Sequence, residues 1–224
     1  MRKIVVVLYG PPGSGKGTQA NLLEKKFDLI HFDTGRFLEA VVHDPKRQDE
    51  ALVKRERKFF DGGQLMTPSF VLGEVSREAR RIHKADFGIV FSGSPRTLYE
   101  AKALYPILEK LYGKKNIFIF ELKLPPGHSI SRNSSRLMCT VCGYGLLTAY
   151  YPRVKAKHCP VCGGPFYRRT LDKPEVIKIR LREYETRTKP ILSMVKKYGY
   201  KVRVIDALPA PYKILAKIAS FIKK

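Results

Sequence analysis

A glycine-rich loop near the start of the chain constrains the fold more than any other feature. The apolar run 4–9 leads into residues 10–18, and a helical pattern follows over 16–27. Glycines let backbone N–H groups curl around an anion, and the helix N-terminus adds its partial positive charge. The strand–loop–helix context favours a phosphate-binding loop over a chance glycine-rich turn. The candidate ATP-binding residues of this loop are Gly10, Gly13, Ser14, Gly15, Lys16, Gly17 and Thr18.

The lysine of this loop is expected to carry part of the chemistry. Lys16 would reach the β- and γ-phosphates of a bound nucleotide. The general motif has Ser or Thr directly after the lysine, whereas here Gly17 intervenes and Thr18 follows. The loop therefore predicts nucleotide binding with one departure from the usual pattern.

Short apolar runs typical of buried strands recur along the chain, separated by helical stretches. The predicted strands are 4–9, 29–32, 88–92, 117–122 and 201–206, and the predicted helices are 16–27, 34–43, 49–60, 70–82, 99–111, 175–197 and 212–223. Strands that alternate with helices predict an α/β fold with a parallel sheet. Residues 137–170 break this rhythm and are expected to form an inserted lobe.

That lobe contains the four cysteines of the chain, in two pairs. Cys139 and Cys142 form one C-x-x-C, Cys159 and Cys162 form the other, and sixteen residues separate the pairs. Two such knuckles can close a tetrahedral Zn²⁺ site. Two disulfides or one redox-active pair are the alternatives, and a reducing cytosol argues against structural disulfides. We expect a structural Zn²⁺ site, because all four ligands would be protein groups.

Composition limits the class of protein. The chain has 224 residues, which predicts a single domain over 1–224, and 44% hydrophobic residues are enough for a buried core. The longest apolar run, residues 4–9, is far shorter than the ~20 residues that a membrane helix needs. We expect a soluble, cytoplasmic monomer that has no membrane partner. Lys plus Arg is 43 and Asp plus Glu is 20, so the formal charge of +23 favours anionic partners, nucleic acid among them.

Three motifs in order carry a resemblance to a known family. The loop at 10–18, the segment Asp33-Thr34-Gly35 and the stretch 93–97 (GSPRT) together resemble the adenylate kinase and nucleoside monophosphate kinase family. The cysteine-bearing lobe resembles the zinc-binding lid of the family's longer members. The resemblance implies a P-loop kinase core with a five-stranded parallel sheet flanked by helices. It also implies an acceptor-binding arm at 34–66 and a zinc-binding lid inserted at 132–170; "the arm" and "the lid" denote these residues below.

The same resemblance implies an activity and a set of site residues. The family transfers the γ-phosphoryl of ATP, with Mg²⁺, to a nucleoside monophosphate, with AMP as the default acceptor. Arg132 matches an arginine that packs on the donor base. Residues with implied catalytic roles are Lys16, Arg96, Arg136, Arg169 and Arg180, and residues with implied acceptor-binding roles are Thr34, Arg36, Met66, Arg96 and Glu100. Arginines suit this task, because phosphoryl transfer depends on positioning and on neutralising the charge of the moving group.

Several positions depart from the family pattern. The strand before Pro-Arg-Thr normally ends in an aspartate that supports Mg²⁺, and here it ends in Ser92. Serine can hydrogen-bond a metal-bound water but brings no charge. Arg36 stands where the family has an acidic residue, and Glu39 stands where it has an arginine for the acceptor phosphate, so the charges are inverted along one helix face. Glu39 would repel that phosphate unless Arg36 turns in to replace the arginine.

Glu100 occupies the position of a glutamine that reads adenine. A carboxylate only accepts hydrogen bonds, so it would face an acceptor nitrogen of adenine but could pair with the N1–H and amine of guanine. GMP or another monophosphate therefore stays open as the acceptor. The alternative is a solvent-facing glutamate at the start of a helix.

These departures leave two hypotheses for function. The first is an ATP-dependent nucleoside monophosphate kinase. The second is a nucleotide-binding protein with weak or lost kinase activity that acts through RNA, in which lid residues such as Arg153 and Lys155 offer a basic surface. An assay for ADP formation with each monophosphate separates them.

Overall fold

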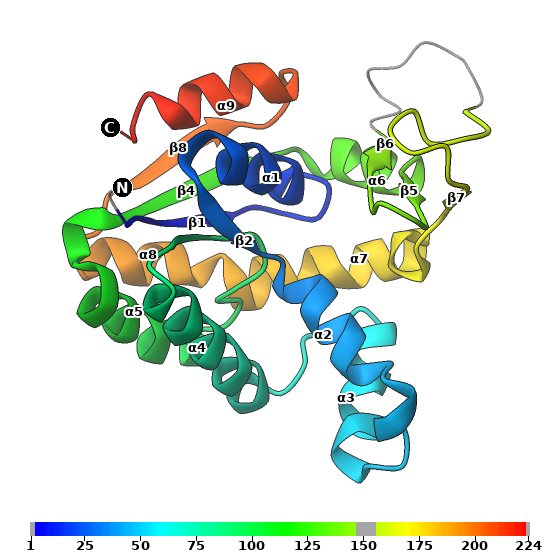
Figure 1. Ribbon diagram of the computed structural model, residues 1–224, viewed down its shortest axis with the longest axis horizontal. Helices are drawn as coiled ribbons and strands as arrows, with labels where there is room; N and C mark the ends of the chain where they lie inside the picture. The colour runs from blue at the N-terminus through cyan, green and yellow to red at the C-terminus, as the bar shows by residue number, and fades with distance from the viewer. Residues whose placement is uncertain (1–2, 147–155, 223–224) are drawn as a thin grey trace.

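The core of the molecule is a parallel sheet of five strands. The computed structural model describes residues 3–146 and 156–222. The strand order is β2 (Leu29–Phe32), β3 (Gly88–Phe91), β1 (Val5–Tyr9), β4 (Ile117–Lys123), β8 (Val202–Asp206), and every neighbouring pair is parallel. The carboxyl ends of these strands lie at one edge of the sheet, where the loop after β1 emerges (Figure 1). The expected α/β architecture is confirmed.

The residues of β1 alternate between two hydrophobic cores because successive side chains of a strand point to opposite faces. Val5 and Val7 pack into the core that holds residues of α4 (Pro68–Lys84), α5 (Leu98–Tyr112) and α8 (Pro190–Lys197). Val6 and Leu8 pack into the core under α1 (Lys16–Phe27) and α9 (Pro211–Ala219). All residues of β1 are buried and β1 is the central strand, so the loop that follows starts from the middle of the core.

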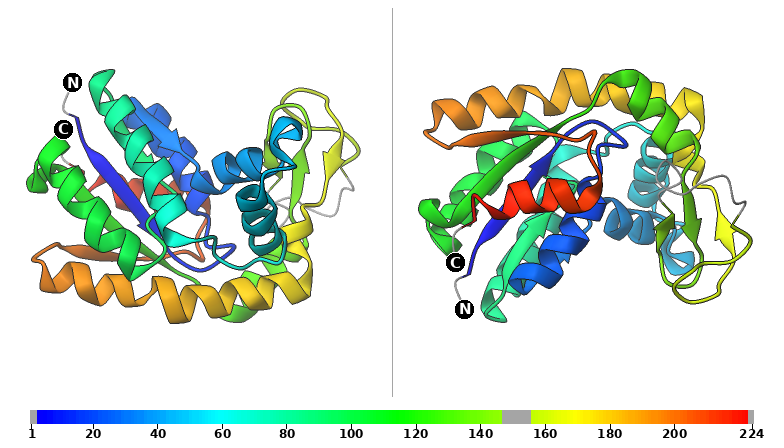
Figure 2. Two further views of the ribbon diagram at one scale, coloured as in Figure 1. Left: turned by 90° about the horizontal axis from the view of Figure 1, so that it is seen from below. Right: turned by 90° about the horizontal axis from the view of Figure 1, so that it is seen from above.

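Two segments project from the core beside the carboxyl ends of the strands. One holds α2 (Thr34–Val42), a 3₁₀ turn (Pro45–Arg47) and α3 (Ala51–Asp61). The other holds a small antiparallel sheet of β5 (Leu137–Cys139), β6 (Gly145–Leu146) and β7 (Phe166–Tyr167). Both lie at the same end of the molecule in the two views of Figure 2. They coincide with the arm and the lid, whose exact limits and roles remain predictions.

Two helical features differ from the sequence expectation. An additional helix, α6 (Pro126–Ser134), precedes the small sheet. The expected helix 175–197 is divided into α7 (Pro174–Glu183), a π-helical turn (Tyr184–Thr188) and α8. The ring of Pro190 cannot continue an α-helix without disturbing the preceding turn, and the N–H of Lys189 bonds five residues back to the carbonyl of Tyr184 at 2.8 Å.

The described helices include none that is both long enough and apolar enough to cross a membrane.

Candidate active site

The loop after β1 has the backbone shape of an anion cradle. Gly13 and Gly15 have φ of 76° and 86°, a region that side chains other than glycine rarely adopt. A Cβ built on Gly13 would lie 2.7 Å from Nδ2 of Asn133 on α6. Ser129 of the same helix donates to the carbonyl of Pro12 at 2.5 Å. Glycine is therefore required at position 13 both for the turn and for the close approach of α6.

Polar groups around the loop are arranged to meet a ligand. Within the described residues, the buried hydroxyl groups of Ser14, Thr34 and Ser94 have no hydrogen-bond partner, which is unusual for buried polar atoms. The ammonium of Lys16 donates to the carbonyls of Gly10 and Pro11 at 2.7 and 2.9 Å, and it has three hydrogens to donate. One hydrogen thus stays available for an oxygen of a bound phosphate. The loop, the arm and the lid line one cleft of about 1220 Å³.

Cations gather around this loop, and burial together with their mutual repulsion lowers their pKa values. Burial first, and then Arg96, Arg180 and Arg136, lower the pKa of Lys16 well below its ordinary value. Burial and the neighbouring guanidinium groups, Arg136 first among them, lower the pKa of Arg180 to about 9. Burial also lowers the pKa of Arg96, with a smaller contribution from Arg169. All five residues with implied catalytic roles therefore belong to one electrostatically coupled cluster, which a polyphosphate would neutralise.

One buried carboxylate organises part of this cluster. Asp172, whose side chain is only 3% exposed, accepts from Nε and Nη2 of Arg136 at 3.0 and 2.5 Å. Nη1 of Arg180 lies 3.7 Å from the same carboxylate and donates to the carbonyl of Leu171 at 3.1 Å. The bidentate pair fixes the plane of the Arg136 guanidinium, which a single charge contact would not.

Residues with implied acceptor roles come together between the arm and α5. Arg96 is held by its Nε, which donates to the carbonyl of Gly93 at 2.7 Å. Thr34, Met66, Arg96 and Glu100 line a small cavity of about 30 Å³ below the cleft. Arg36 lies apart from this cavity, because its guanidinium is directed toward Gly143 of the lid.

Glu100 is not a solvent-facing glutamate. It is 3% exposed, and its carboxylate accepts from the N–H of Arg96 at 2.9 Å and from the hydroxyl of Thr97 at 2.8 Å. The Thr97 oxygen in turn accepts from the N–H of Glu100 at 3.2 Å, which caps the start of α5 like a capping box, except that the carboxylate accepts from the N–H of Arg96 instead of that of Thr97. Burial raises the pKa of Glu100 above its ordinary value. The interpretation of Glu100 as an exposed residue is therefore wrong. Its carboxylate also has a structural role, because it stabilises the start of α5.

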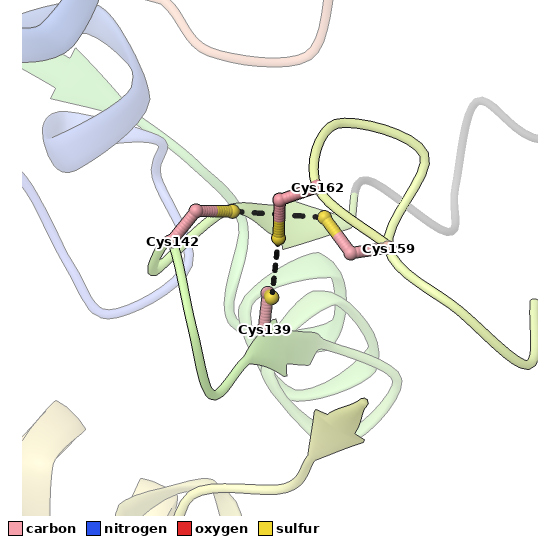
Figure 3. Close-up of side chains that lie close together, drawn as sticks. All are labelled: Cys139, Cys142, Cys159 and Cys162. Carbon is pink, nitrogen blue, oxygen red and sulfur yellow. Dashed lines mark hydrogen bonds between the residues drawn. The ribbon is translucent and has the colours of Figure 1, made fainter. Parts of the chain in front are cut away.

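The four cysteines meet in the lid (Figure 3). Their sulfur atoms all lie within 4.8 Å of one another, and Cys139–Cys162 and Cys142–Cys159 are 3.5 and 3.6 Å apart. A tetrahedral site with Zn–S bonds of about 2.3 Å requires sulfur–sulfur distances of about 3.8 Å. The donor set and its spacing therefore fit Zn²⁺, and these four residues could hold it.

Comparisons with known proteins show which family the chain is similar to. The family model described as Adenylate kinase matches residues 8–200. The adenylate kinase of Caldicellulosiruptor bescii is 35% identical over 199 residues, which cover 88% of this chain and 89% of that protein. The adenylate kinase of Methanothrix thermoacetophila is 36% identical over 196 residues, 87% of each chain, and that of Methanosarcina barkeri is 31% identical over 219 residues, 98% of each.

The chain belongs to the adenylate kinase family. It is an ATP-dependent nucleoside monophosphate kinase, and its cysteine cluster is consistent with the long form of the family that has a zinc-binding lid. Enzymes of this family use Mg²⁺ together with ATP.

Ser92 of the kinase has a partner that the sequence did not reveal. Its hydroxyl lies 2.7 Å from Nε2 of His31, and Nδ1 of His31 lies 2.6 Å from Oδ1 of Asn21. An amide oxygen only accepts, so Nδ1 carries the hydrogen and Nε2 accepts from Ser92. Burial lowers the pKa of His31, which keeps the ring neutral near pH 7. The lone pairs of the Ser92 oxygen are therefore left for another donor, such as a metal-bound water.

Arg132 of the kinase lines the cleft and is anchored there by two hydrogen bonds. Its two terminal nitrogens donate to the carbonyls of Ala207 and Leu208 at 2.8 and 3.1 Å.

Removing zinc from the kinase is expected to destabilise the lid. Reduced protein should contain about one zinc per chain by elemental analysis, and Cys139→Ser should lower the Tm by roughly 5–10 °C, because the ligands anchor two loops with little core of their own. Thr140→Ser, at an exposed residue next to the ligand, is the matched control. Metal-free protein with an unchanged Tm would contradict the zinc assignment.

Proposed function

We propose that the kinase transfers the γ-phosphoryl of ATP to AMP. The cation cluster around the phosphate loop supports this proposal most strongly, because a bound polyphosphate would raise the lowered pKa values of Lys16 and Arg180. The relatives described as adenylate kinases support AMP as the acceptor.

The proposed roles follow the arrangement of the site. The amides of the loop and Lys16 bind the phosphate tail of ATP, with the hydroxyl of Ser14 as a further donor. Arg136, Arg169 and Arg180 neutralise the charge that spreads over the phosphoryl group in flight. Thr34 and Arg96 hold the acceptor phosphate, and Arg132 packs on the donor base.

Magnesium enters the proposal as part of the donor substrate. Mg²⁺ bound to ATP offsets charge on the β- and γ-phosphates. Thr18, in the first turn of α1, and Ser92, directly after β3, are the side chains proposed to face it, through bound water in the case of Ser92. Because Ser92 has no charge, it can act only through a well-placed hydrogen bond. Its orientation by His31 therefore matters more than the orientation of an aspartate would at this position.

GMP is the second candidate acceptor, and one observation favours it. Glu100 lines the small acceptor cavity and has only acceptor atoms when ionised, which suits the donor edge of guanine. Against this, one lone pair of each carboxylate oxygen is already committed to Arg96 or Thr97. AMP is therefore proposed first.

The assay that tests the function measures ADP formation from ATP and Mg²⁺ with AMP, GMP, CMP and UMP in turn. We expect AMP to be preferred, and Glu100→Gln to raise the AMP:GMP ratio of kcat/KM roughly tenfold, because an amide can donate to adenine N1. The expected Tm is slightly lower, since Gln has one acceptor fewer for the cap. Glu109→Gln, farther along α5, is the control. A wild-type preference for GMP would overturn AMP, and an unchanged ratio would show that Glu100 does not read the base.

The RNA-associated alternative remains a prediction. Its basic residues Arg153 and Lys155 lie outside the described residues. ATP binding without turnover on any of the four monophosphates would favour it over the proposal above. We also propose a cytoplasmic location, which suits the four free thiols because reducing compartments keep cysteines reduced. The monomeric state remains a prediction.

A further inference from the structure

The inverted charges of α2 face the lid. Arg36 and Glu39 lie nearly one turn apart on α2, and both reach residues more than 100 positions further along the chain. Nη2 of Arg169 donates to Oε2 of Glu39 at 3.0 Å. A Cβ built on Gly143 would lie 3.2 Å from Nη1 of Arg36, so that guanidinium rests against the knuckle of the first cysteine pair. The arm and the lid are thus in contact at two points.

The ion pair is better shielded than an ordinary surface pair. The side chains of Arg169 and Glu39 are 19% and 38% exposed. Both residues line the cleft, with Arg169 on the lid side and Glu39 on the arm side. Water and salt screen fully exposed ion pairs, which therefore contribute almost nothing to stability. Partial burial weakens this screening.

The surroundings of Arg169 explain what a carboxylate does here. Arg169 contributes to lowering the pKa values of Arg96 and Arg180, so it lies within reach of their charges. Repulsion by the neighbouring guanidinium groups drives a flexible cation toward solvent unless an anion holds it. Asp172 does this for Arg136, and within the described part of the chain Glu39 forms the ion pair with Arg169.

We propose that Glu39 and Arg36 are positioning residues that join the arm to the lid, so that both close over the cleft as one unit and Arg169 is held over the phosphates. The family charge pattern is inverted at these two positions because their partners are on the lid instead of on the acceptor phosphate. Glu39 belongs to the acceptor side, and Arg169 to the transferring phosphoryl. The pair therefore couples the two substrates, and its kinetic consequence rests on the proposed function.

The first test needs no nucleotide. Small-angle scattering of the free protein should give a compact molecule, and Glu39→Arg should raise its radius of gyration because two cations then face each other. Glu50→Arg is the matched control, since Glu50 pairs with Arg47 inside the arm. The double variant Glu39→Arg with Arg169→Glu should restore the compact curve but not turnover. An unchanged curve for Glu39→Arg would overturn the proposal, whatever the enzyme does.

The second test separates positioning from a local effect. Glu39→Arg should raise the KM of ATP as well as that of the monophosphate, each roughly tenfold, with a smaller change in kcat. Arg36→Gln should shift both KM values in the same direction by a smaller factor. A rise confined to the monophosphate would show that Glu39 acts on the acceptor alone and would overturn the coupling. If the wild type turned over no monophosphate, the proposed function would fail while the scattering would still decide the contact.

Discussion

Lys16→Ala is expected to lower kcat/KM about 10³-fold while leaving the fold as stable as before or more stable. The loss arises because the ammonium would reach the β- and γ-phosphates in the proposed site. The stability follows from the lowered pKa of Lys16, since a charge buried beside Arg96 and Arg180 disfavours the folded state wherever it is protonated. Alanine removes that repulsion.

Steady-state kinetics and thermal unfolding measured on the same preparations check this prediction. Lys26→Ala, an exposed lysine of the same helix, should change neither quantity. Retained turnover in Lys16→Ala would remove the loop lysine from the mechanism. A large fall in the Tm would mean that the bonds of Lys16 to the carbonyls of Gly10 and Pro11 outweigh the repulsion.

Asp172→Asn is expected to damage activity and stability together. Removing one partner of a buried ion pair costs about 3 kcal/mol of unfolding free energy, and here it would leave two guanidinium groups without their shared carboxylate. The kcat should fall about 100-fold, because Arg136 and Arg180 lose the orientation needed to meet the transferring phosphoryl. The KM values should change less, since the loop and Arg96 stay in place.

Urea unfolding and initial-rate kinetics measure the two effects, with Asp49→Asn as the control at a fully exposed carboxylate. If Asp172→Asn loses stability but keeps its kcat, Asp172 is a structural anchor and the two arginines are positioned by other contacts.

The phosphate loop and the five strands could be predicted because their signals are local. The run at 4–9 is apolar because β1 is buried on both faces, and the glycines of the loop are required by its own backbone. Short buried strands followed by helices leave little choice of architecture.

Helix α6 was missed because its inward face is polar. Ser129 and Asn133 are fully buried, yet they contact the phosphate loop instead of an apolar core, so no hydrophobic stripe marks the helix. The only local signal was Pro126 at the first position, which is favourable at a helix start.

The partners of the charged residues that depart from the family pattern could not be predicted from neighbouring residues in the sequence either. From the sequence, Glu39 is expected to repel a phosphate. Its actual partner, Arg169, lies 130 residues further along the chain. The sequence alone leaves Glu100 either as a base reader or as an exposed residue, whereas the structure buries it at the capped start of α5, bonded to Thr97 three positions earlier. The S/T-x-x-E spacing was the available signal.

The contact between α6 and the phosphate loop determines where the lid can bend. Ser129 is bonded to Pro12, and Asn133 fills the space beside Gly13, so the helix and the loop form one rigid block. The small sheet of the lid begins shortly after this helix, with β5. A swing of that sheet would therefore be absorbed between Ser134 and Leu137 and, where the chain returns to the core, between Tyr167 and Pro174, while the cradle keeps its shape. Capture of the triphosphate tail can then precede every larger rearrangement.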